Sequence, residues 1–353
     1  MMNGSCPQIT YLVDPRFPGG TSSALAEELK VISAICRPHL RGLKSSMFKG
    51  GHVSRQLQEA CEETHVPFSW SGQTITSDVI IIQNPAFLKF QETMGIKLLA
   101  KTIIVVTHEN FYRPTGEPAF DIDTVLDAID DASIACKKIL APISPYNRST
   151  VECWVQSKGE TVWSVLPLDW FNICDFDVQK PTEKPRDRRG RLSRAGHEKF
   201  PSLASLDQSF PASAESCVLL GADNFIPFGI DRPHWELHPF GSMLVDTFFD
   251  EIDFMVYHTS PTWRESFGRV IAESIAAGKV VITDAETAAN FDGGVVHANP
   301  KDVSAHIEHI IGNPGRYQSI VAEGQKALSR YSAQNFRDFF TCVMADVSEW
   351  NAA

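Results

Sequence analysis

The chain has 353 residues, 43% of them hydrophobic and 21% charged, and a formal net charge of −11 at pH 7. This composition indicates a folded protein of about two domains, excludes a general nucleic-acid binder, and leaves no run near the roughly 18 apolar residues of a membrane-spanning helix. The N-terminal residues lack an apolar signal core and the eight cysteines form no Cys-x-x-Cys pair, so we expect a cytoplasmic protein with reduced thiols.

The first part of the chain is typical of an α/β domain. A short apolar strand is expected at Ile9–Val13, a tight turn at Pro18–Thr21, and a helix from Ser22 to Ile35 that Thr21 or Ser22 caps. Further apolar runs predict strands at residues 78–83 and 102–107. Strands separated by helices imply a parallel sheet, which binds ligands at the carboxyl ends of its strands.

One segment of this domain is strongly basic. Residues 37–55 include five arginines and lysines and not a single acid. Such a segment suits an anionic lipid-linked acceptor or peripheral contact with the inner face of a membrane, although an ordinary solvated surface has the same composition. The basic residues predicted to make this contact are Arg37, Arg41, Lys44 and Lys49.

A linker is expected between Asp175 and Arg189, where the chain is rich in proline and charge. We therefore place an N-terminal domain at residues 1–178, a second domain at 179–333 and a final helix within 334–353. Because residues 185–189 are charged, we expect the first strand of the second domain to be short or lost.

A βαβ unit is expected nearer the C-terminus. An apolar strand at Asp253–Tyr257 is followed by a loop, a helix carrying Glu265 and Glu273, a stop at Gly278 and a second strand at Val280–Ile282. Eight positions are slightly over two helical turns, so both carboxylates would lie along one line of that helix, about 12 Å apart. A ligand of nucleotide-sugar length would reach both.

The start of this helix is a second candidate feature. Backbone N–H groups at Phe267, Gly268 and Arg269, with the positive end of the helix dipole, suit a phosphate or a developing negative charge. Two bare glutamates at this spacing are more often solvated side chains of a surface helix. The flanking strands, the Phe-Gly pair and the glycine stop favour a site.

This segment resembles the Glu-x7-Glu signature of retaining glycosyltransferases with the GT-B fold, particularly glycosyltransferase family 4. The resemblance implies two Rossmann-like α/β/α domains that face each other across a cleft, and a last helix that crosses back to the first domain. It places Glu265 at the donor sugar as a catalytic residue and Glu273 at the nucleotide ribose. The backbone N–H groups of the helix start assign Phe267 and Gly268 to the donor diphosphate.

The Gly-Arg pair after the linker is similar to another family pattern. Arg191 is followed eight positions later by Lys199, and the resemblance implies that both bind the donor diphosphate. Guanidinium and ammonium groups suit that task, although the residues alone also describe a basic linker.

Two assignments fall in the first domain. His108 follows the strand at residues 102–107, where an α/β domain exposes side chains to a crevice. A lone histidine there is usually structural, but the family has a histidine that faces the transferred sugar, so we predict a catalytic role. The turn of Gly19, Gly20 and Thr21 is assigned to an acceptor or phosphate loop.

The resemblance predicts a metal-independent, retaining hexosyltransferase without a cofactor, which uses a UDP- or GDP-sugar donor and a glycan, lipid-linked or protein-linked acceptor. The sequence Asp121-Ile-Asp123 matches a metal-binding Asp-x-Asp pattern, but Asp121 is better explained as a helix cap. Two alternatives stay open: another GT-B enzyme, such as a sugar-nucleotide epimerase or a phosphorylase, and a non-catalytic binding or scaffold protein.

Overall fold

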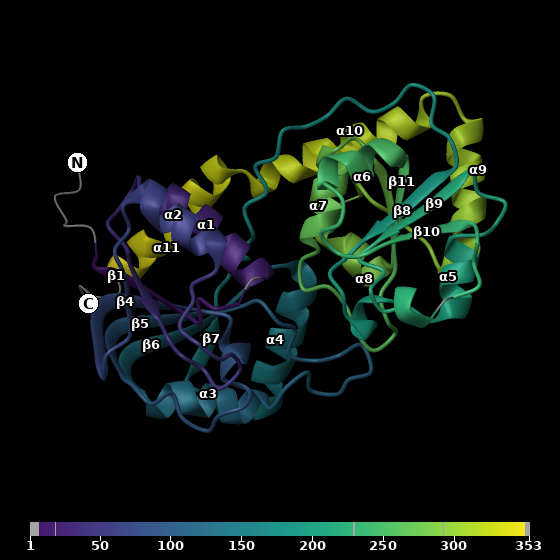
Figure 1. Ribbon diagram of the computed structural model, residues 1–353. Coiled ribbons are helices and arrows are strands. Elements are labelled where there is room, and N and C mark those ends of the chain that lie inside the picture. Colours follow the sequence, from purple (N-terminus) through teal and green to yellow (C-terminus); the bar gives the residue numbers. More distant parts are fainter. Residues whose placement is uncertain (1–6, 18, 229, 292, 350–353) are drawn as a thin grey trace. The chain divides into compact units, whose positions relative to one another are not determined.

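The computed structural model describes residues 7–17, 19–228, 230–291 and 293–349, which form two compact α/β units (Figure 1). The first unit comprises the residues up to Tyr112, Gly116–Ile173 and those from Tyr331 onward. The second comprises Arg113–Thr115 and Cys174–Arg330. Within the described ranges, no helix is both long and apolar enough to cross a bilayer.

The first unit is built on a seven-stranded parallel sheet in the order β3-β2-β1-β4-β5-β6-β7. In Figure 1, α1, α2 and α11 lie on one side of this sheet and α3 and α4 on the other. The strands are β1 (Ile9–Val13), β2 (His39–Gly42), β3 (Phe68–Trp70), β4 (Thr74–Gln83), β5 (Lys97–Thr107), β6 (Ser133–Pro142) and β7 (Trp163–Val165). The helices are α1 (Gly20–Ile32), α2 (Arg55–Thr64), η1 (Pro85–Leu88), α3 (Ile122–Asp131), α4 (Pro145–Lys158) and α11 (Ala333–Glu349).

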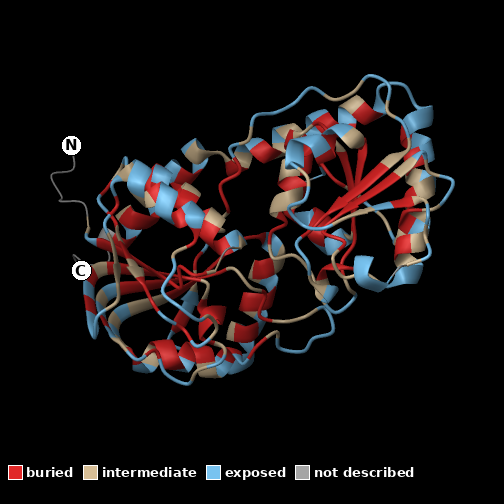
Figure 2. Ribbon diagram, viewed as in Figure 1, coloured by how far each residue is buried: buried red, intermediate tan, exposed pale blue. Residues whose placement is uncertain are grey.

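The central strands of this sheet are covered on both faces, which explains their continuous apolar sequences. All five residues of β1 are buried, and so are the last five of β4 and the last six of β5. Figure 2 shows these strands buried between the helices. The carboxyl ends of β4 and β5 are therefore rigidly held, and they lead directly to Asn84 and His108.

The second unit has a six-stranded parallel sheet in the order β10-β9-β8-β11-β12-β13. Its strands are β8 (Arg188–Leu192), β9 (Ser216–Leu220), β10 (Trp235–His238), β11 (Phe254–Tyr257), β12 (Val280–Thr283) and β13 (Val296–His297). Its α-helices are α5 (Leu203–Ser209), α6 (Val245–Glu251), α7 (Arg269–Ala276), α8 (Ala285–Ala288), α9 (Val303–Gly312) and α10 (Arg316–Leu328). Short 3₁₀ turns are η2 (His197–Lys199), η3 (Ile226–Phe228), η4 (Ala289–Phe291), η5 (Pro300–Asp302) and η6 (Ser329–Tyr331).

Strand β8 corrects one expectation, because it is present at the centre of this sheet, between β9 and β11. Arg189 is only 1% exposed, yet its guanidinium donates to the carboxylate of Asp187, the carbonyl oxygen of Ser209 and the hydroxyl of Ser304. Arg188 pairs with Asp253 at 2.8 Å. A charged strand is tolerated here because its charges find partners inside the fold.

Other predicted elements are present with shifted ends. Helix α1 begins at Gly20 with Gly19 as its N-cap, so the expected cap at Thr21 or Ser22 was wrong. A Cβ at Gly19 would lie 2.4 Å from the Phe17 ring, which explains the glycine. Strands β4 and β5 start earlier than expected, in stretches where buried and exposed residues alternate. The last expected helical residue, Trp350, lies outside the described residues.

The C-terminal helix α11 belongs to the first unit, where it contacts α1. Its aromatic residues surround Trp170, with ring centroids 5.9 Å from Phe336, 5.6 Å from Phe339 and 5.9 Å from Phe340. Trp170 is fully buried. Edge-to-face contacts of this kind are favourable beyond the area that they bury, so this cluster holds α11 against the unit.

Candidate functional site

The predicted donor residues come together at the carboxyl edge of the second sheet. Arg191 lies near the end of β8, Lys199 in η2 after β8, and Glu265 in the loop after β11. The carboxyl ends of parallel strands meet at one edge of a sheet. This explains how positions up to 74 residues apart in the chain form one cluster.

A buried ion pair joins two of these residues. Nζ of Lys199 lies 2.6 Å from Oε1 of Glu265, and the two side chains are 10% and 14% exposed. The Tyr257 hydroxyl donates to the same carboxylate oxygen, and Nζ of Lys199 lies 3.7 Å from the centroid of the Trp263 ring. Burial lowers the pKa of Lys199 and raises that of Tyr257. Glu265 is therefore held in one orientation by two donors.

Arg191 is the most unusual group of the cluster. It is fully buried, and its guanidinium lies between the rings of Phe200 and Tyr257, 4.6 Å and 4.4 Å from their centroids. Nη2 donates to the Lys199 carbonyl oxygen, whereas Nε and Nη1 have no hydrogen-bond partner among the described residues. Burial lowers the pKa of Arg191 to about 10, which still leaves it charged at pH 7. Two unpaired buried donors on a cation fit an anionic ligand.

Two further polar groups of this edge were missed by the sequence analysis. His258 follows β11, and its Nε2 lies 2.8 Å from the Ala298 carbonyl oxygen. This bond requires a proton on Nε2, so Nδ1 of the neutral ring is an acceptor. Nδ1 of His258 and Oγ of Ser193 are buried without partners among the described residues. The only feature of the sequence that could have identified them is their position directly after the strands β11 and β8.

The structure corrects the placement of Glu265. Helix α7 begins at Arg269, so Glu265 lies in the preceding loop and shares no helix with Glu273. Gly268, at φ +94°, starts the helix in a conformation that other residues rarely adopt. The argument from two helical turns was therefore wrong, although the loop returns Glu265 to the cluster of Lys199 and Tyr257.

Glu273 is engaged elsewhere. Its Oε1 lies 2.9 Å from Nε of Arg269, one turn earlier on α7, and the two side chains are 27% and 33% exposed. Burial raises the pKa of Glu273. Phe267 is 3% exposed and packs against Phe291 at 5.7 Å. Its side chain is part of the core, which leaves its backbone for the predicted diphosphate role.

In the first unit, His108 lies directly after β5, half-buried, with Nε2 2.6 Å from Oε1 of Gln83. Burial lowers the pKa of His108 to about 3. The predicted acceptor loop lies at the start of α1, where Gly19 is the N-cap and the Thr21 hydroxyl accepts from the Asn84 amide at 3.2 Å. The roles of these residues stay predictions.

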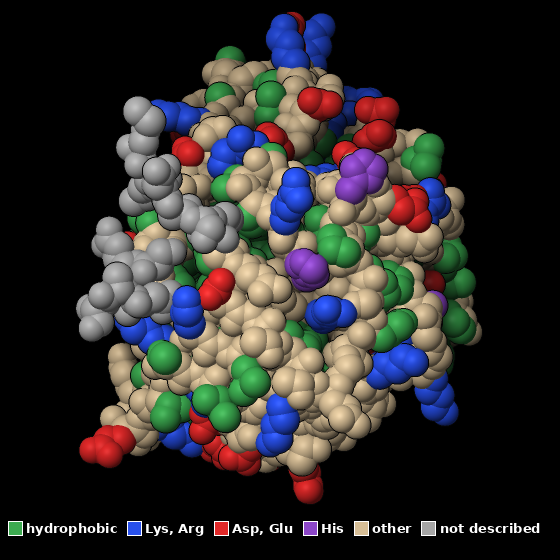
Figure 3. Space-filling view, turned by 90° about the vertical axis from the view of Figure 1, so that its left-hand side faces the viewer, with side chains coloured by type: hydrophobic (Ala, Val, Ile, Leu, Met, Phe, Trp, Pro, Cys, Tyr) green, Lys and Arg blue, Asp and Glu red, His purple; other side chains and the backbone are tan. Residues whose placement is uncertain are grey.

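The basic segment begins before β2 and continues through β2 into the loop after it. Arg41 donates to the Ser69 hydroxyl, and Nζ of Lys44 lies 4.9 Å from the Trp70 ring centroid. Arg37 and Lys49 are exposed. On the face drawn in Figure 3, most lysines and arginines are scattered among uncharged and acidic groups. The membrane contact stays a prediction.

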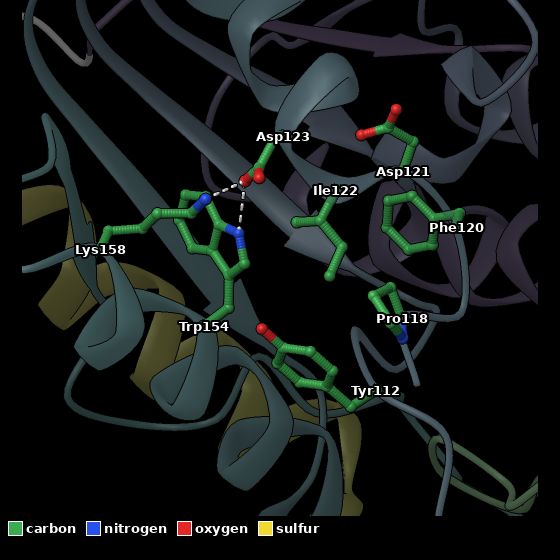
Figure 4. A pocket seen from close by; sticks show the side chains of 8 residues that line it. All are labelled: Tyr112, Pro118, Phe120, Asp121, Ile122, Asp123, Trp154 and Lys158. Carbon is green, nitrogen blue, oxygen red and sulfur yellow. Dashed lines mark hydrogen bonds and ion pairs between the residues drawn. The ribbon is translucent and has the colours of Figure 1, made fainter. Parts of the chain in front are cut away.

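A separate hollow of about 290 Å³ in the first unit contains the rejected Asp-x-Asp pair (Figure 4). The Asp121 carboxylate accepts from the backbone N–H of Thr124, which confirms it as the cap of α3. Oδ1 of Asp123 lies 2.6 Å from Nζ of Lys158 and accepts from the Trp154 indole at 2.9 Å. Both carboxylates are thus explained by protein contacts. Independence of a metal stays a prediction.

Solved structures of similar fold match this chain over nearly its whole length. The crystal structure of Anabaena HepE in complex with UDP matches with a TM-score of 0.66 and 14% identity, covering 96% of this chain and 100% of that one. A sucrose-phosphate synthase from Thermosynechococcus elongatus matches at 0.62, with 12% identity and 98% and 100% coverage. A UDP-forming trehalose-phosphate synthase from Burkholderia vietnamiensis matches at 0.59, with 12% identity and the same coverage.

Sequence comparison adds nothing to this, since no protein-family model and no curated protein matches the chain. At identities of 11 to 15% the likeness establishes architecture. Both sheets are parallel and have helices on their faces, as the predicted fold class requires. The chain therefore has the GT-B fold.

Proposed function

We propose that this protein is a glycosyltransferase that moves a sugar from a nucleoside diphosphate donor, a UDP-sugar first of all, to a hydroxyl of an acceptor. One observation carries the proposal. Arg191 is a fully buried cation with two unpartnered donors among the described residues, next to the Lys199–Glu265 ion pair, at the carboxyl edge of a parallel sheet. The fold adds support, because solved structures that share it were determined with UDP or are named UDP-forming synthases.

In this proposal Arg191 and Lys199 bind the donor diphosphate. Nε and Nη1 of Arg191 each supply one donor, on different sides of the guanidinium plane's long axis, and the Lys199 ammonium can keep its bond to Glu265 while it donates to a phosphate oxygen. As the glycosidic bond breaks, negative charge develops on the leaving diphosphate. A preorganised cation in a buried site stabilises that charge more than one in water does.

Glu265 accepts a hydrogen bond from a hydroxyl of the donor sugar, because Lys199 and Tyr257 already orient its carboxylate. Glu273 binds the ribose hydroxyls after leaving Arg269. That exchange is inexpensive, since an ion pair about one-third exposed contributes little. The backbone at Phe267 and Gly268 completes the diphosphate site.

The first unit supplies the acceptor side of the reaction. His108 faces the transferred sugar, and Gly19, Gly20 and Thr21 line the acceptor or phosphate loop. Transfer proceeds with retention and without a metal, to a glycan, lipid-linked or protein-linked acceptor. A lipid-linked acceptor would suit Arg37, Arg41, Lys44 and Lys49.

The first experiment is a thermal stabilisation screen with UDP, GDP, ADP and dTDP and their common sugars. A ligand at a hundred times its dissociation constant adds about 2.7 kcal/mol to the folded state. Stabilisation by one nucleotide family supports the donor site. Product analysis with and without an acceptor then separates a transferase from an epimerase or a phosphorylase, and tight binding without turnover indicates a scaffold protein.

Arg191→Met provides a sharper test, with Arg186→Met as its control. Arg186 is exposed and pairs with Glu215 on the surface. We expect Arg191→Met to keep or raise the melting temperature without ligand, since it removes two unpaired buried donors, and to lose stabilisation by UDP. Transfer slows by about 10²-fold or more. An Arg191→Met protein with the UDP response of the wild type contradicts the site.

A further inference from the structure

A chain of hydrogen bonds runs through the interior of the first unit and ends at His108. Nε2 of His108 lies 2.6 Å from Oε1 of Gln83, and Nε2 of Gln83 donates to Oε2 of Glu28 at 2.9 Å. The Trp170 indole donates to Oε1 of Glu28 at 3.0 Å. Gln83 and Trp170 are fully buried and Glu28 is 1% exposed. The proposed reaction uses His108 and gives the other three residues no role.

The donor and acceptor atoms in the structure give the direction of these bonds. The Trp170 indole N–H is only a donor, and the Gln83 amide donates to the other oxygen of Glu28. The Gln83 carbonyl oxygen is thereby turned toward His108. Because a carbonyl oxygen only accepts, the ring nitrogen that faces it, Nε2, carries the proton.

The other ring nitrogen of His108 is then an acceptor. Nδ1 has no hydrogen-bond partner among the described residues. Burial lowers the pKa of His108 to about 3, so the ring is neutral at pH 7 and Nδ1 carries a lone pair. At the carboxyl end of β5, where parallel sheets bind ligands, this nitrogen suits a hydroxyl group.

An amide at position 83 is essential to this arrangement. A carboxylate there would also accept from Nε2, but its negative charge would favour the charged imidazolium. Both ring nitrogens of an imidazolium are donors. Gln83 therefore orients the ring while leaving it neutral, and Glu28 holds the Gln83 amide in the required direction.

We infer that Gln83 and Glu28 are positioning residues that hold His108 as the Nε2-protonated tautomer and present Nδ1 as an acceptor for a sugar hydroxyl. The identity of that hydroxyl rests on the proposed function, whereas the tautomer is a property of the free protein. Trp170 is the last member of this series of hydrogen bonds, at the opposite end from His108. Helix α11 therefore contributes to the site through the packing of Phe336, Phe339 and Phe340 on the Trp170 indole.

The tautomer is tested without substrate. Long-range ¹H–¹⁵N correlation spectra of the full chain, labelled at histidine nitrogen, report which ring nitrogens are protonated, and a His108→Gln variant identifies the signals of His108. We expect a neutral ring at pH 7 with a proton on Nε2 alone. A proton on Nδ1, or on both nitrogens, overturns the inference whatever the protein catalyses.

The positioning role is tested by the pH dependence of UDP-glucose turnover in Gln83→Glu and Gln83→Met. We expect Gln83→Glu to lower kcat/KM at least tenfold at pH 7 and to recover at higher pH, because His108 must first lose its extra proton. Gln83→Met should lose activity at every pH without moving the profile. The control is Gln56→Glu, which adds the same charge at an exposed position on α2.

Melting temperatures establish that each variant folds. Equal losses in both Gln83 variants, with an unmoved pH profile, indicate a purely structural glutamine and overturn the positioning role. If the wild-type protein turns over no UDP-sugar, the proposed function fails, and the spectra alone decide the tautomer.

Discussion

Replacing Glu28 by glutamine should change how the stability of the first unit depends on pH. Glu28 is 1% exposed, and burial raises its pKa from 4.5 to about 8. The folded state therefore favours the protonated acid. The contribution of this titration to the free energy of unfolding is fully present below pH 4.5. It is lost as the pH rises through about 8.

The magnitude follows from the two pKa values. One pKa unit corresponds to about 1.4 kcal/mol, so the complete titration changes the free energy of unfolding by about 5 kcal/mol. About 4 kcal/mol of this change occurs between pH 5 and pH 9. Glutamine does not titrate. Its NH₂ group must face one of the two donors, from Trp170 or Gln83, which costs about 1 to 3 kcal/mol at every pH.

Guanidinium denaturation from pH 5 to pH 9 measures the effect, followed by tryptophan fluorescence. We expect Glu28→Gln to be less stable than the wild type at pH 5, and the difference to fall by about 4 kcal/mol and change sign by pH 9. The control is Glu27→Gln, a neighbouring glutamate whose side chain is 36% exposed. Parallel stability curves for wild type and Glu28→Gln would refute the assignment of a buried, neutral acid.

Two other substitutions have clear expected outcomes. Gly221 has φ +93°, and a Cβ there would lie 1.7 Å from the Ser193 carbonyl oxygen. Gly221→Ala should therefore destabilise the second unit by more than about 2 kcal/mol in thermal unfolding. The control is Gly72→Ala, because the space around Gly72 is open. Tyr257→Phe removes the hydroxyl that donates to Glu265. We expect about a tenfold lower kcat with an unchanged melting temperature, and an unchanged kcat would show that Tyr257 does not orient the carboxylate.

The fold class was predictable from the sequence because its strands are buried on both faces. Such strands have continuous apolar sequences, as at Ile9–Val13 and Val280–Thr283, and the helices between them imply parallel pairing. The start and stop signals of turns and helices are local as well, such as the Asp121 cap. These features depend on residues a few positions apart, which a single sequence displays.

Strand β8 and the buried contacts were decided only by the tertiary structure. The arginines of β8 resemble a linker until Asp253 and Ser304, far along the chain, meet them inside the fold. Glu28 likewise meets Trp170 across 142 positions. Hydrophobic periodicity records whether a segment is buried, but the partner of a buried polar group depends on which distant segments cross it, and no local pattern encodes that.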